Sequence, residues 1–322
     1  MEKNPLVSVP VITYNSSKTI LETLESIKAQ TYQNIELIIS DDCSTDNTVE
    51  ICKKWVSENE HRFVRTVVLE SPVNTGISAN GNRAEDVCQG EWVKGIAGDD
   101  VLLPKCIEEF LKFVRINTDA IYVFCKINVF GADPTICKQR EEMAIDFCDL
   151  ILKLNSEDQL NYILLGMCPP APGCFYNRLK AQKLGIVNDE RIKFIEDWPK
   201  WIKFLETGNR LYVIDKCLVN YRLGGISSSE RWESLDLFMS KRQVFFYYVL
   251  KHELKRGKDN VISSIIDFEC DLYSRYLTEH AFAEKIRHNK YFKFIYDIRT
   301  YFINAIMRIE SFCKFKANRF DN

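Results

Sequence analysis

The sequence lacks most of the short motifs that identify common protein classes. Its 12 cysteines include no CxxC pair, and no Cys/His cluster has the spacing of a zinc site. No GxGxxG follows the first apolar segment and no GxxxxGK[ST] occurs anywhere, which counts against a dinucleotide oxidoreductase and a P-loop NTPase. No run of about 18 uncharged apolar residues could span a membrane, and "MEKNPLVSV" does not resemble a signal peptide. We therefore expect a cytoplasmic protein with reduced cysteines.

The sequence also lacks an excess of charge of either sign. Its 43 Lys and Arg nearly balance its 45 Asp and Glu, for a net charge of −2. The field of the whole protein therefore offers no case for nucleic-acid binding, and we expect no nucleic-acid partner. With 322 residues, the chain can form one large α/β domain with additions or two modest domains.

The first half of the chain alternates apolar segments with amphipathic ones. We expect strands at 6–12, 35–40, 63–69, 91–97 and 120–130, and helices at 16–30, 44–58, 78–89 and 104–117. This alternation predicts an α/β fold with a mostly parallel sheet and helices on both faces. Pro10 lacks the N–H group that a central strand uses, so we expect a bulge near the end of the first strand.

The second half is less regular. We expect a helix over 145–166, a proline-glycine loop over 168–175, and a helix over 194–209 that follows the acidic segment "EDW". Beyond residue 229 the pattern is helical. We predict a catalytic domain over 1–230, divided into a nucleotide-binding half (1–118) and an acceptor half (119–230), and a helical C-terminal extension over 231–322.

Polar and acidic residues follow three of the predicted strands. They are "TYN" (13–15), "SDDCSTD" (40–46) and "AGDD" (97–100). Because ligands bind outside the carboxyl ends of such strands, these residues predict a site at that edge of the sheet. Adjacent carboxylates such as Asp99 and Asp100 suit Mg²⁺ or Mn²⁺, although a helix cap with an acidic turn explains the same letters. Thr45 or Asp46 can likewise simply cap the next helix.

Five segments, in their order, resemble the successive motifs of the family 2 glycosyltransferases. They are "VSVPVITYN", "SIKAQTYQNIELIISDDCSTDNT", "NTGISANGNR", "GEWVKGIAGDD" and "EDWPKWIKFLETG". The resemblance runs from 6 to 229, about two-thirds of the chain. It implies a GT-A fold and an enzyme that moves a sugar from a nucleotide-diphosphate donor, UDP-linked in our expectation, to a glycan hydroxyl. The bacterial members of the family that build capsule, O-antigen or exopolysaccharide, some on lipid-linked acceptors, are the expected relatives.

The resemblance also implies roles for particular residues. Inversion at the sugar, Mn²⁺ or Mg²⁺ as the cofactor, and a carboxylate general base are expected. The resemblance assigns the nucleotide pocket to Ile12, Tyr14, Asn15 and Asp42, and the donor loop to Asn74, Gly76, Asn82 and Arg83. It assigns the metal to Asp99 and Asp100. It assigns catalysis to Asp197, with Glu196 beside it, and a phosphate contact to Arg222.

Four positions depart from the family pattern. Ile12 stands where a proline is usual, Gly81 where an arginine is usual, Ala97 where the metal motif has its first acid, and Gly224 where a histidine often follows "YR". These departures leave open a degenerate protein that binds a sugar nucleotide or organises a complex without transfer. A nucleotidyltransferase is disfavoured, because "ITYNSSKT" is neither glycine-rich nor arginine-bearing.

The last segment, 285–322, carries nine Lys and Arg against three Asp and Glu. Apolar residues from Tyr291 to Phe312 recur at steps of four and three, which predicts one amphipathic helix. One interpretation is a helix packed on the catalytic domain or on a second subunit of a homodimer. The other is a helix on the inner surface of the cell membrane, facing anionic lipid.

Overall fold

The structure, a computed structural model, describes residues 4–223 except 165, 167 and 193, together with 240, 243–250 and 252. The chain divides into two compact units, 1–244 and 245–322. In the second unit the described residues form a π-helix, η4 (Phe245–Leu250). The predicted domain boundary at 230 and the predicted helix over 285–322 lie outside the described residues, so both stay predictions.

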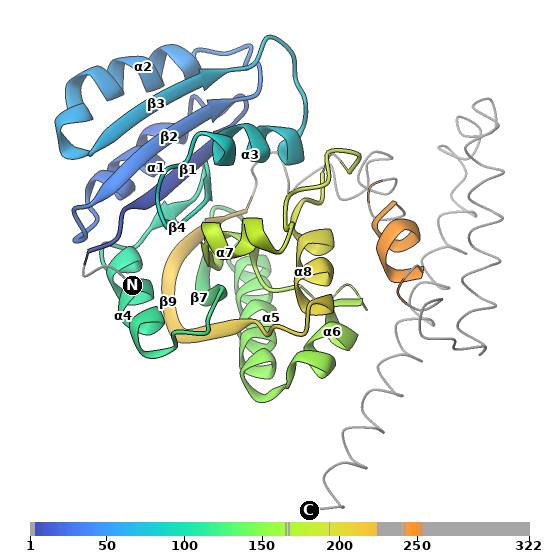
Figure 1. The fold of residues 1–322 in the computed structure, drawn as a ribbon. Helices are drawn as coiled ribbons and strands as arrows, with labels where there is room; N and C mark the ends of the chain where they lie inside the picture. The colour runs from blue at the N-terminus through green and yellow to red at the C-terminus, as the bar shows by residue number, and fades with distance from the viewer. Residues whose placement is uncertain are drawn as a thin grey trace, which may run out of the picture. The chain divides into compact units, whose positions relative to one another are not determined.

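One sheet organises the first unit (Figure 1). Its strands are β1 (Val7–Thr13), β2 (Ile35–Asp41), β3 (Arg65–Glu70), β4 (Trp92–Val93), β5 (Ile96–Ala97), β6 (Val101–Leu102), β7 (Tyr122–Phe130), β8 (Cys174–Asn177) and β9 (Tyr212–Arg222). The order is β3-β2-β1-β4-β8-β7-β9-β6, and β5 also pairs with β1. The pairs β1·β2, β2·β3, β1·β4, β1·β5 and β7·β9 are parallel, whereas β8 and β6 run antiparallel to their neighbours.

Helices cover both faces of the parallel part of this sheet. Side chains on one face of β1 and β2 pack with α1 (Ile20–Lys28) and α2 (Thr48–Asn59) in the main core. On the other face, Ile12 and Ile38 meet Ala84 of α3 (Ile77–Asp86). Burial on both faces explains why β2 is mostly apolar, as parallel strands usually are. The predicted α/β class, with a mostly parallel sheet, is confirmed.

Pro10 lies inside β1 without a bulge, so that prediction is wrong. The register of β1 against β2 runs unbroken from Val7 to Thr13. The carbonyls of Ser8 and Ile12 accept from the opposite side, from Lys94 and Gly98. Because backbone groups of a strand alternate in direction, the N position of Pro10 also faces that side, where the neighbouring strand is interrupted. The missing N–H therefore costs the ladder no bond.

That interruption corrects a second prediction, a single strand over 91–97. β4 ends at Val93 and β5 begins at Ile96. Lys94 and Gly95 lie between them, opposite Pro10, whose Cγ is 4.0 Å from the position of a Cβ built on Gly95. The break follows from Pro10, because a continuous strand here would leave one of its own carbonyls without a donor.

The second half contains α4 (Cys106–Ile116), α5 (Pro134–Lys153), α6 (Ser156–Leu164), α7 (Arg178–Lys183) and α8 (Asp197–Glu206), and the chain has short 3₁₀ helices η1 (Glu60–Arg62) and η2 (Ala171–Gly173). The helix predicted over 145–166 starts too late and is two helices, α5 and α6, although most of its residues are helical. The Asp133 side chain caps α5 by accepting the N–H of Thr135 at 2.9 Å, eleven residues before the expected start. Leu154 is extended and ends the helix.

The loop predicted over 168–175 is also partly wrong, because β8 begins at Cys174. This short strand lies between β4 and β7. Its Phe175 ring stacks on Trp92 and Phe110, with centroids 5.1 and 4.8 Å apart. Aromatic packing in the core therefore holds a strand that its proline-rich surroundings conceal.

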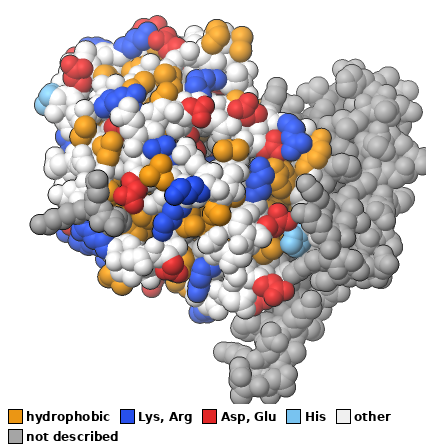
Figure 2. All heavy atoms as spheres, viewed as in Figure 1, with side chains coloured by type: hydrophobic (Ala, Val, Ile, Leu, Met, Phe, Trp, Pro, Cys, Tyr) orange, Lys and Arg blue, Asp and Glu red, His pale blue; other side chains and the backbone are white. Residues whose placement is uncertain are grey.

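The surface and the helices add two observations. On the face in Figure 2, acidic, basic and hydrophobic side chains are interspersed over the described residues. None of the helices in the described part of the chain combines the length and the apolar character needed to cross a membrane.

Candidate functional site

The loops that follow β1 and β2 are bound to each other at the carboxyl edge of the sheet. Asn15, in the left-handed region at φ 51°, donates its N–H to Ser44 Oγ at 2.8 Å, and its Oδ1 accepts the N–H of Thr45 at 2.8 Å. Asn is one of the few residues that adopt this conformation readily. The structure thus brings Tyr14 and Asn15 beside the "SDDCSTD" segment.

Asp42 anchors the predicted donor loop. Its buried carboxylate accepts the N–H groups of Thr75, at 3.0 Å, and Gly76, at 2.7 Å, and lies 3.6 Å from Nη2 of Arg83. Gly76 precedes α3 with φ 89°, a conformation that favours glycine. The segment 74–76 is therefore fixed to the end of β2, and Asn74 lies exposed next to it.

Two threonines, Thr19 just before α1 and Thr23 within it, hold the turn that carries Asp99 and Asp100. Thr19 Oγ1 donates to the Gly98 carbonyl at 2.9 Å, and Thr23 Oγ1 donates to the Asp100 carbonyl at 2.7 Å. A Cβ on Gly98 would lie 3.0 Å from Thr13 Oγ1, so the turn packs closely against the end of β1. The aspartates therefore lie beside the loop of Tyr14 and Asn15.

Arg222, the last residue of β9, meets both aspartates across a separation of more than 120 residues. Its N–H donates to Asp100 Oδ1 at 2.9 Å, and its Nε donates to the Asp99 carbonyl at 2.9 Å. The guanidinium also pairs with Glu22 and lies 4.3 Å from the Phe130 ring centroid. The pairing of β6 with β9 is what brings these distant segments together.

The two aspartates carry charge that the fold compensates only in part. Burial, followed by the charge of Asp99, raises the pKa of Asp100 to about 8, while the Arg222 N–H and Lys94 act against that rise. Burial also raises the pKa of Asp99. Lys94 is wholly buried, and its Nζ donates to the carbonyls of Gly95, at 2.8 Å, and Pro172, at 2.7 Å.

This pair fits a hard divalent cation. Two desolvated, mutually repelling carboxylates gain from a positive charge between or beside them. Among the described residues, no three His, Cys, Asp or Glu side chains cluster to hold a metal. Mn²⁺ or Mg²⁺ here would therefore take its other ligands from phosphate and water, as such ions commonly do.

A second pair of acids, Glu196 and Asp197, opens α8. Asp197 Oδ1 accepts the N–H of Trp198 at 2.7 Å. Burial, followed by the charge of Asp197, raises the pKa of Glu196 to about 7, and burial raises the pKa of Asp197. Trp198 is held by a bond from its Nε1 to the Ile163 carbonyl at 2.6 Å. Desolvated carboxylates with raised pKa values are suited to proton transfer near neutral pH.

The Cys174 thiol of β8 lies between the two acidic motifs. Burial raises its pKa to about 12, and the charges of Lys200, Lys94, Glu85 and Asp197 all act on it. Lys94 belongs to the β4–β5 break just before Asp99, and Lys200 lies one turn after Asp197. The strand that sequence reasoning missed therefore lies within electrostatic reach of Asp197 and of Lys94.

Two predicted donor residues have other contacts in the structure. Ile12 packs against α3 on the apolar face of the sheet. Asn82 bonds to the segment before α8: its Nδ2 donates to the Asn188 carbonyl at 3.1 Å and to Glu190 at 2.9 Å, and its Oδ1 accepts the Asn188 N–H at 3.2 Å. Ser78 also donates to the Ile192 carbonyl. We call these bonds from Ser78 and Asn82 to 188–192 the α3 clasp.

The α3 clasp also gives a context for Gly81, where the family usually has an arginine. A Cβ at Gly81 would lie 3.0 Å from Nδ2 of Asn188, which is 4 % exposed. The amide of Asn188 thus packs directly on the glycine. Nothing in the sequence near Asn188 signals this contact.

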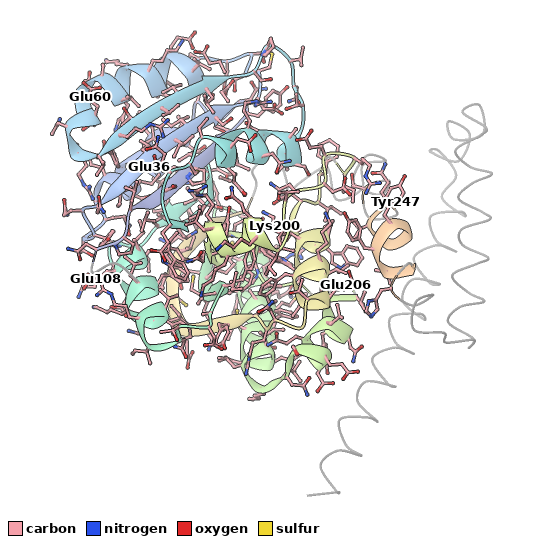
Figure 3. The ribbon with its side chains drawn as sticks, viewed as in Figure 1. Glu36, Glu60, Glu108, Lys200, Glu206 and Tyr247 are labelled. Atoms are coloured by element: carbon pink, nitrogen blue, oxygen red, sulfur yellow. The ribbon has the colours of Figure 1, made fainter. Side chains whose placement is uncertain are left out.

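Sequence reasoning also missed a buried network beneath the sheet. Glu36, labelled in Figure 3, is fully buried and accepts from Ser8 Oγ at 2.5 Å, from the Gly90 N–H at 2.9 Å and from Arg65 at 2.9 Å. These hydrogen bonds lower the pKa of Glu36 although burial acts to raise it. The polar letters at Ser8 and Glu36 inside apolar strands are the signal that could have revealed it.

Comparisons with known proteins bear on the whole arrangement. Residues 8–184 match the profile described as glycosyl transferase family 2. The chain is similar to TuaG of Bacillus subtilis (strain 168), named for teichuronic acid biosynthesis, with 28 % identity over 231 residues, 71 % of this chain and 84 % of that protein.

Two solved structures share the fold at a TM-score of 0.58. One is S. aureus TarS 1–349 in complex with UDP-GlcNAc, 21 % identical, where the match covers 81 % of this chain and 69 % of that chain. The other is the mannosyltransferase PcManGT from Pyrobaculum calidifontis in complex with GDP-Man and Mn²⁺, 16 % identical, with 95 % and 87 % covered. In a structure of a longer TarS chain, the match covers 41 % of that chain.

Proposed function

The chain belongs to glycosyl transferase family 2, and we propose that it transfers a sugar from a UDP-linked donor to a hydroxyl of a bacterial surface glycan. The predicted family and GT-A-like fold are thereby confirmed. The UDP-GlcNAc bound to TarS supports the donor class, and the name of TuaG supports the acceptor class. We further propose that the enzyme works on the cytoplasmic face of the membrane, where a lipid-linked acceptor is presented.

The observation that carries the proposal is the adjacent pair of half-buried Asp99 and buried Asp100 beside Arg222, at the edge where the donor loop is anchored. This arrangement supports binding of a diphosphate through one divalent cation and one guanidinium. Asp42, already holding Thr75 and Gly76, directs the donor loop toward the base of the nucleotide. Tyr14 and Asn15 contribute the neighbouring wall.

Mn²⁺ or Mg²⁺ held by Asp99 and Asp100 would supply positive charge to the diphosphate that departs with the nucleotide. The Mn²⁺ in the PcManGT complex supports this assignment. Arg222 stays beside the two acids through its bonds to their backbone and carboxylate. Its cation adds to the same stabilisation, because guanidinium groups bind phosphates well.

Asp197 is the proposed general base. An acceptor hydroxyl must lose its proton as its oxygen attacks the anomeric carbon, and a carboxylate within hydrogen-bond reach can take that proton. Attack from the side opposite the nucleotide inverts the configuration. Glu196 lies next to Asp197, and its charge state changes the affinity of the pair for the transferred proton.

A panel of sugar nucleotides tests the function directly. The full-length protein is incubated with UDP-, GDP- and TDP-sugars, with Mn²⁺ or with EDTA, and release of the nucleoside diphosphate is followed. We expect release from a UDP-sugar that requires the metal. UDP binding without turnover of any donor, in the presence of a glycan extract, would favour a sugar-nucleotide-binding protein without transfer activity.

A further inference from the structure

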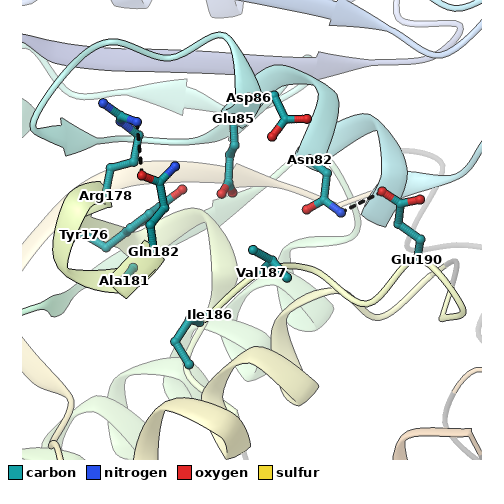
Figure 4. Close-up of a pocket in the computed structure, with 10 residues that line it drawn as sticks. All are labelled: Asn82, Glu85, Asp86, Tyr176, Arg178, Ala181, Gln182, Ile186, Val187 and Glu190. Carbon is teal, nitrogen blue, oxygen red and sulfur yellow. Dashed lines mark hydrogen bonds between the residues drawn. The ribbon is translucent and has the colours of Figure 1, made fainter. Parts of the chain in front are cut away.

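A pocket of about 200 Å³ opens between α3, α7 and the segment 186–190 (Figure 4). Its walls include Glu85 and Asp86 of α3, Tyr176 of β8, Gln182 of α7, and Val187 and Glu190. The volume is below the about 300–1,000 Å³ of sites for drug-sized ligands. The pocket therefore has room for a single ring and not for a nucleotide sugar.

The polar groups of this pocket are mostly hydrogen-bond acceptors. One oxygen of Glu85 accepts a hydrogen bond from Lys200 at 3.4 Å. Because a carboxylate offers about four lone-pair sites, Glu85 can accept further bonds. The Asp86 side chain, which is exposed, takes no hydrogen bond or ion pair from any described residue. Gln182 uses its Oε1 on Arg178 at 3.4 Å, which leaves its N–H₂ group as a donor.

Tyr176 adds a donor that the protein itself leaves unused. Its hydroxyl is buried without a hydrogen-bond partner among the described residues, and it faces the Glu85 carboxylate (Figure 4). Burial, with the charge of Glu85, raises its pKa well above the ordinary value, so the hydroxyl keeps its proton. Buried polar groups are nearly always bonded, and the acceptor that this hydroxyl faces is the Glu85 carboxylate.

The charges exclude some ligands. Glu85, Asp86 and Glu190 face the pocket, and the cationic groups nearby, Arg178 and Lys200, already bind protein atoms. A phosphate or a uronic acid would meet three carboxylates and only one guanidinium in the described walls, that of Arg178, which donates to the Gly90 carbonyl. Neutral hydroxyl groups, which donate to carboxylates and accept from an amide, match the walls.

An ion pair connects the pocket wall to α8, the helix that begins at the proposed base. Lys200, which pairs with Glu85, lies three residues after Asp197, roughly 4.5 Å farther along the helix axis. Residues three apart lie on the same side of a helix. The α3 clasp fixes the outer wall, since Asn82 bonds to Asn188 and Glu190. One ion pair and one turn of α8 therefore connect the pocket to the proposed base.

We propose that this pocket is a distal acceptor subsite, which binds a neutral sugar ring of the acceptor glycan next to the ring that receives the transferred sugar. The proposal rests on the proposed function for the identity of the acceptor. It makes the pocket a determinant of which glycans are extended, because a site built to bond hydroxyls rejects ligands without them.

The test uses the full-length protein and the methyl glycosides of glucose, galactose, mannose and N-acetylglucosamine. Binding is followed by saturation-transfer NMR. We expect binding of at least one glycoside, weakened tenfold or more by Val187→Trp, which fills the pocket from an exposed position, and measurably by Asp86→Asn. Val64→Trp, also exposed, and Asp146→Asn serve as matched controls and should leave binding unchanged.

The outcomes separate this proposal from the proposed function. Absence of binding by all four glycosides, or equal binding by Val187→Trp and the wild type, would overturn the subsite. UDP titrated in the presence of Mn²⁺ reports on the donor site in the same samples. Loss of glycoside binding in Val187→Trp with UDP affinity intact supports the subsite, and absence of UDP binding would contradict the proposed function alone.

Discussion

The aspartates at the end of β2 and those between β5 and β6 lie at the same edge of the sheet, but the protein surrounds them differently. Asp41 and Asp42 accept hydrogen bonds from the N–H and hydroxyl groups of Ser44, Thr75 and Gly76. Asp99 is half-buried and Asp100 is buried beside it, with only partial compensation of their charge from Arg222 and Lys94.

This difference separates two tasks that the same residue type performs. The first pair is satisfied within the protein and fixes the loops of the donor side. The negative charge of the second pair, like that of Glu196 and Asp197, is only partly balanced within the protein, and a cation or a proton can balance the rest. Strongly perturbed carboxylates of this kind mark functional sites more often than satisfied ones do.

The largest expected effect comes from the uncompensated pair. The double variant Asp99→Ala and Asp100→Ala should abolish metal-dependent UDP binding and transfer, because the proposed ligands of the cation are removed. Isothermal titration with UDP, with and without Mn²⁺, measures the loss. Asp215→Asn, on the exposed surface of β9, is the control and should bind UDP normally. Unchanged binding in the double variant would remove the two acids from the metal site.

The next effect concerns the acids of α8. Asp197→Asn should lower the rate of transfer by about 10²–10⁴-fold, the usual contribution of a general base. UDP affinity should stay within about twofold, because the donor is held at the other pair. Steady-state kinetics with the active donor measures both. Transfer at the wild-type rate would exclude Asp197 as the base.

The satisfied pair should instead affect stability. Asp42→Ala removes a buried acceptor from the N–H groups of Thr75 and Gly76, which costs about 2–3 kcal/mol of the free energy of unfolding. Asp99→Ala, which removes a desolvated charge, should cost much less. Urea unfolding of the two variants makes the comparison. An equal loss in both would show that the two pairs do not differ as proposed.

The smallest effect is a pH dependence. The folded state raises the pKa of Glu196 from 4.5 to about 7, so the folded protein binds this proton more tightly than the unfolded chain does. The free energy of unfolding should therefore fall as the pH rises from about 4.5 to about 7. Glu196→Gln should make that slope shallower, whereas Glu58→Gln, on the exposed face of α2, should not. Unfolding curves at pH 5 and pH 7.5 measure the slopes.

The sequence predicted the parallel part of the fold well for a physical reason. Strands buried on both faces have mostly apolar sequences, and β2 with its neighbours α1 and α2 can be recognised without any distant partner. The short strand β8, by contrast, packs its Phe175 on Trp92 and Phe110, which lie far away in the chain. The break between β4 and β5 likewise depends on Pro10, more than 80 residues earlier.

The candidate site divides along the same line. Its acidic motifs are local in sequence, so Asp99, Asp100, Glu196 and Asp197 could be proposed as candidates directly. The partners of these acids are distant in sequence. Nothing in the sequence indicates that Lys94, a single charge in a predicted strand, is buried and hydrogen-bonded. The contact of Asn82 with Asn188 likewise appears only in the structure. The assignments of the site residues stay predictions until the variants above are measured.

The α3 clasp has a consequence for recombination within the family. Residues 188–192, which lead to the proposed base, are matched to two side chains of the donor helix rather than to the sheet. A chimera that joins this nucleotide-binding half to the acceptor half of a relative would lose that match. Exchanging α3 together with the acceptor half keeps the interface intact, so the natural unit for swapping acceptor preference is discontinuous in sequence.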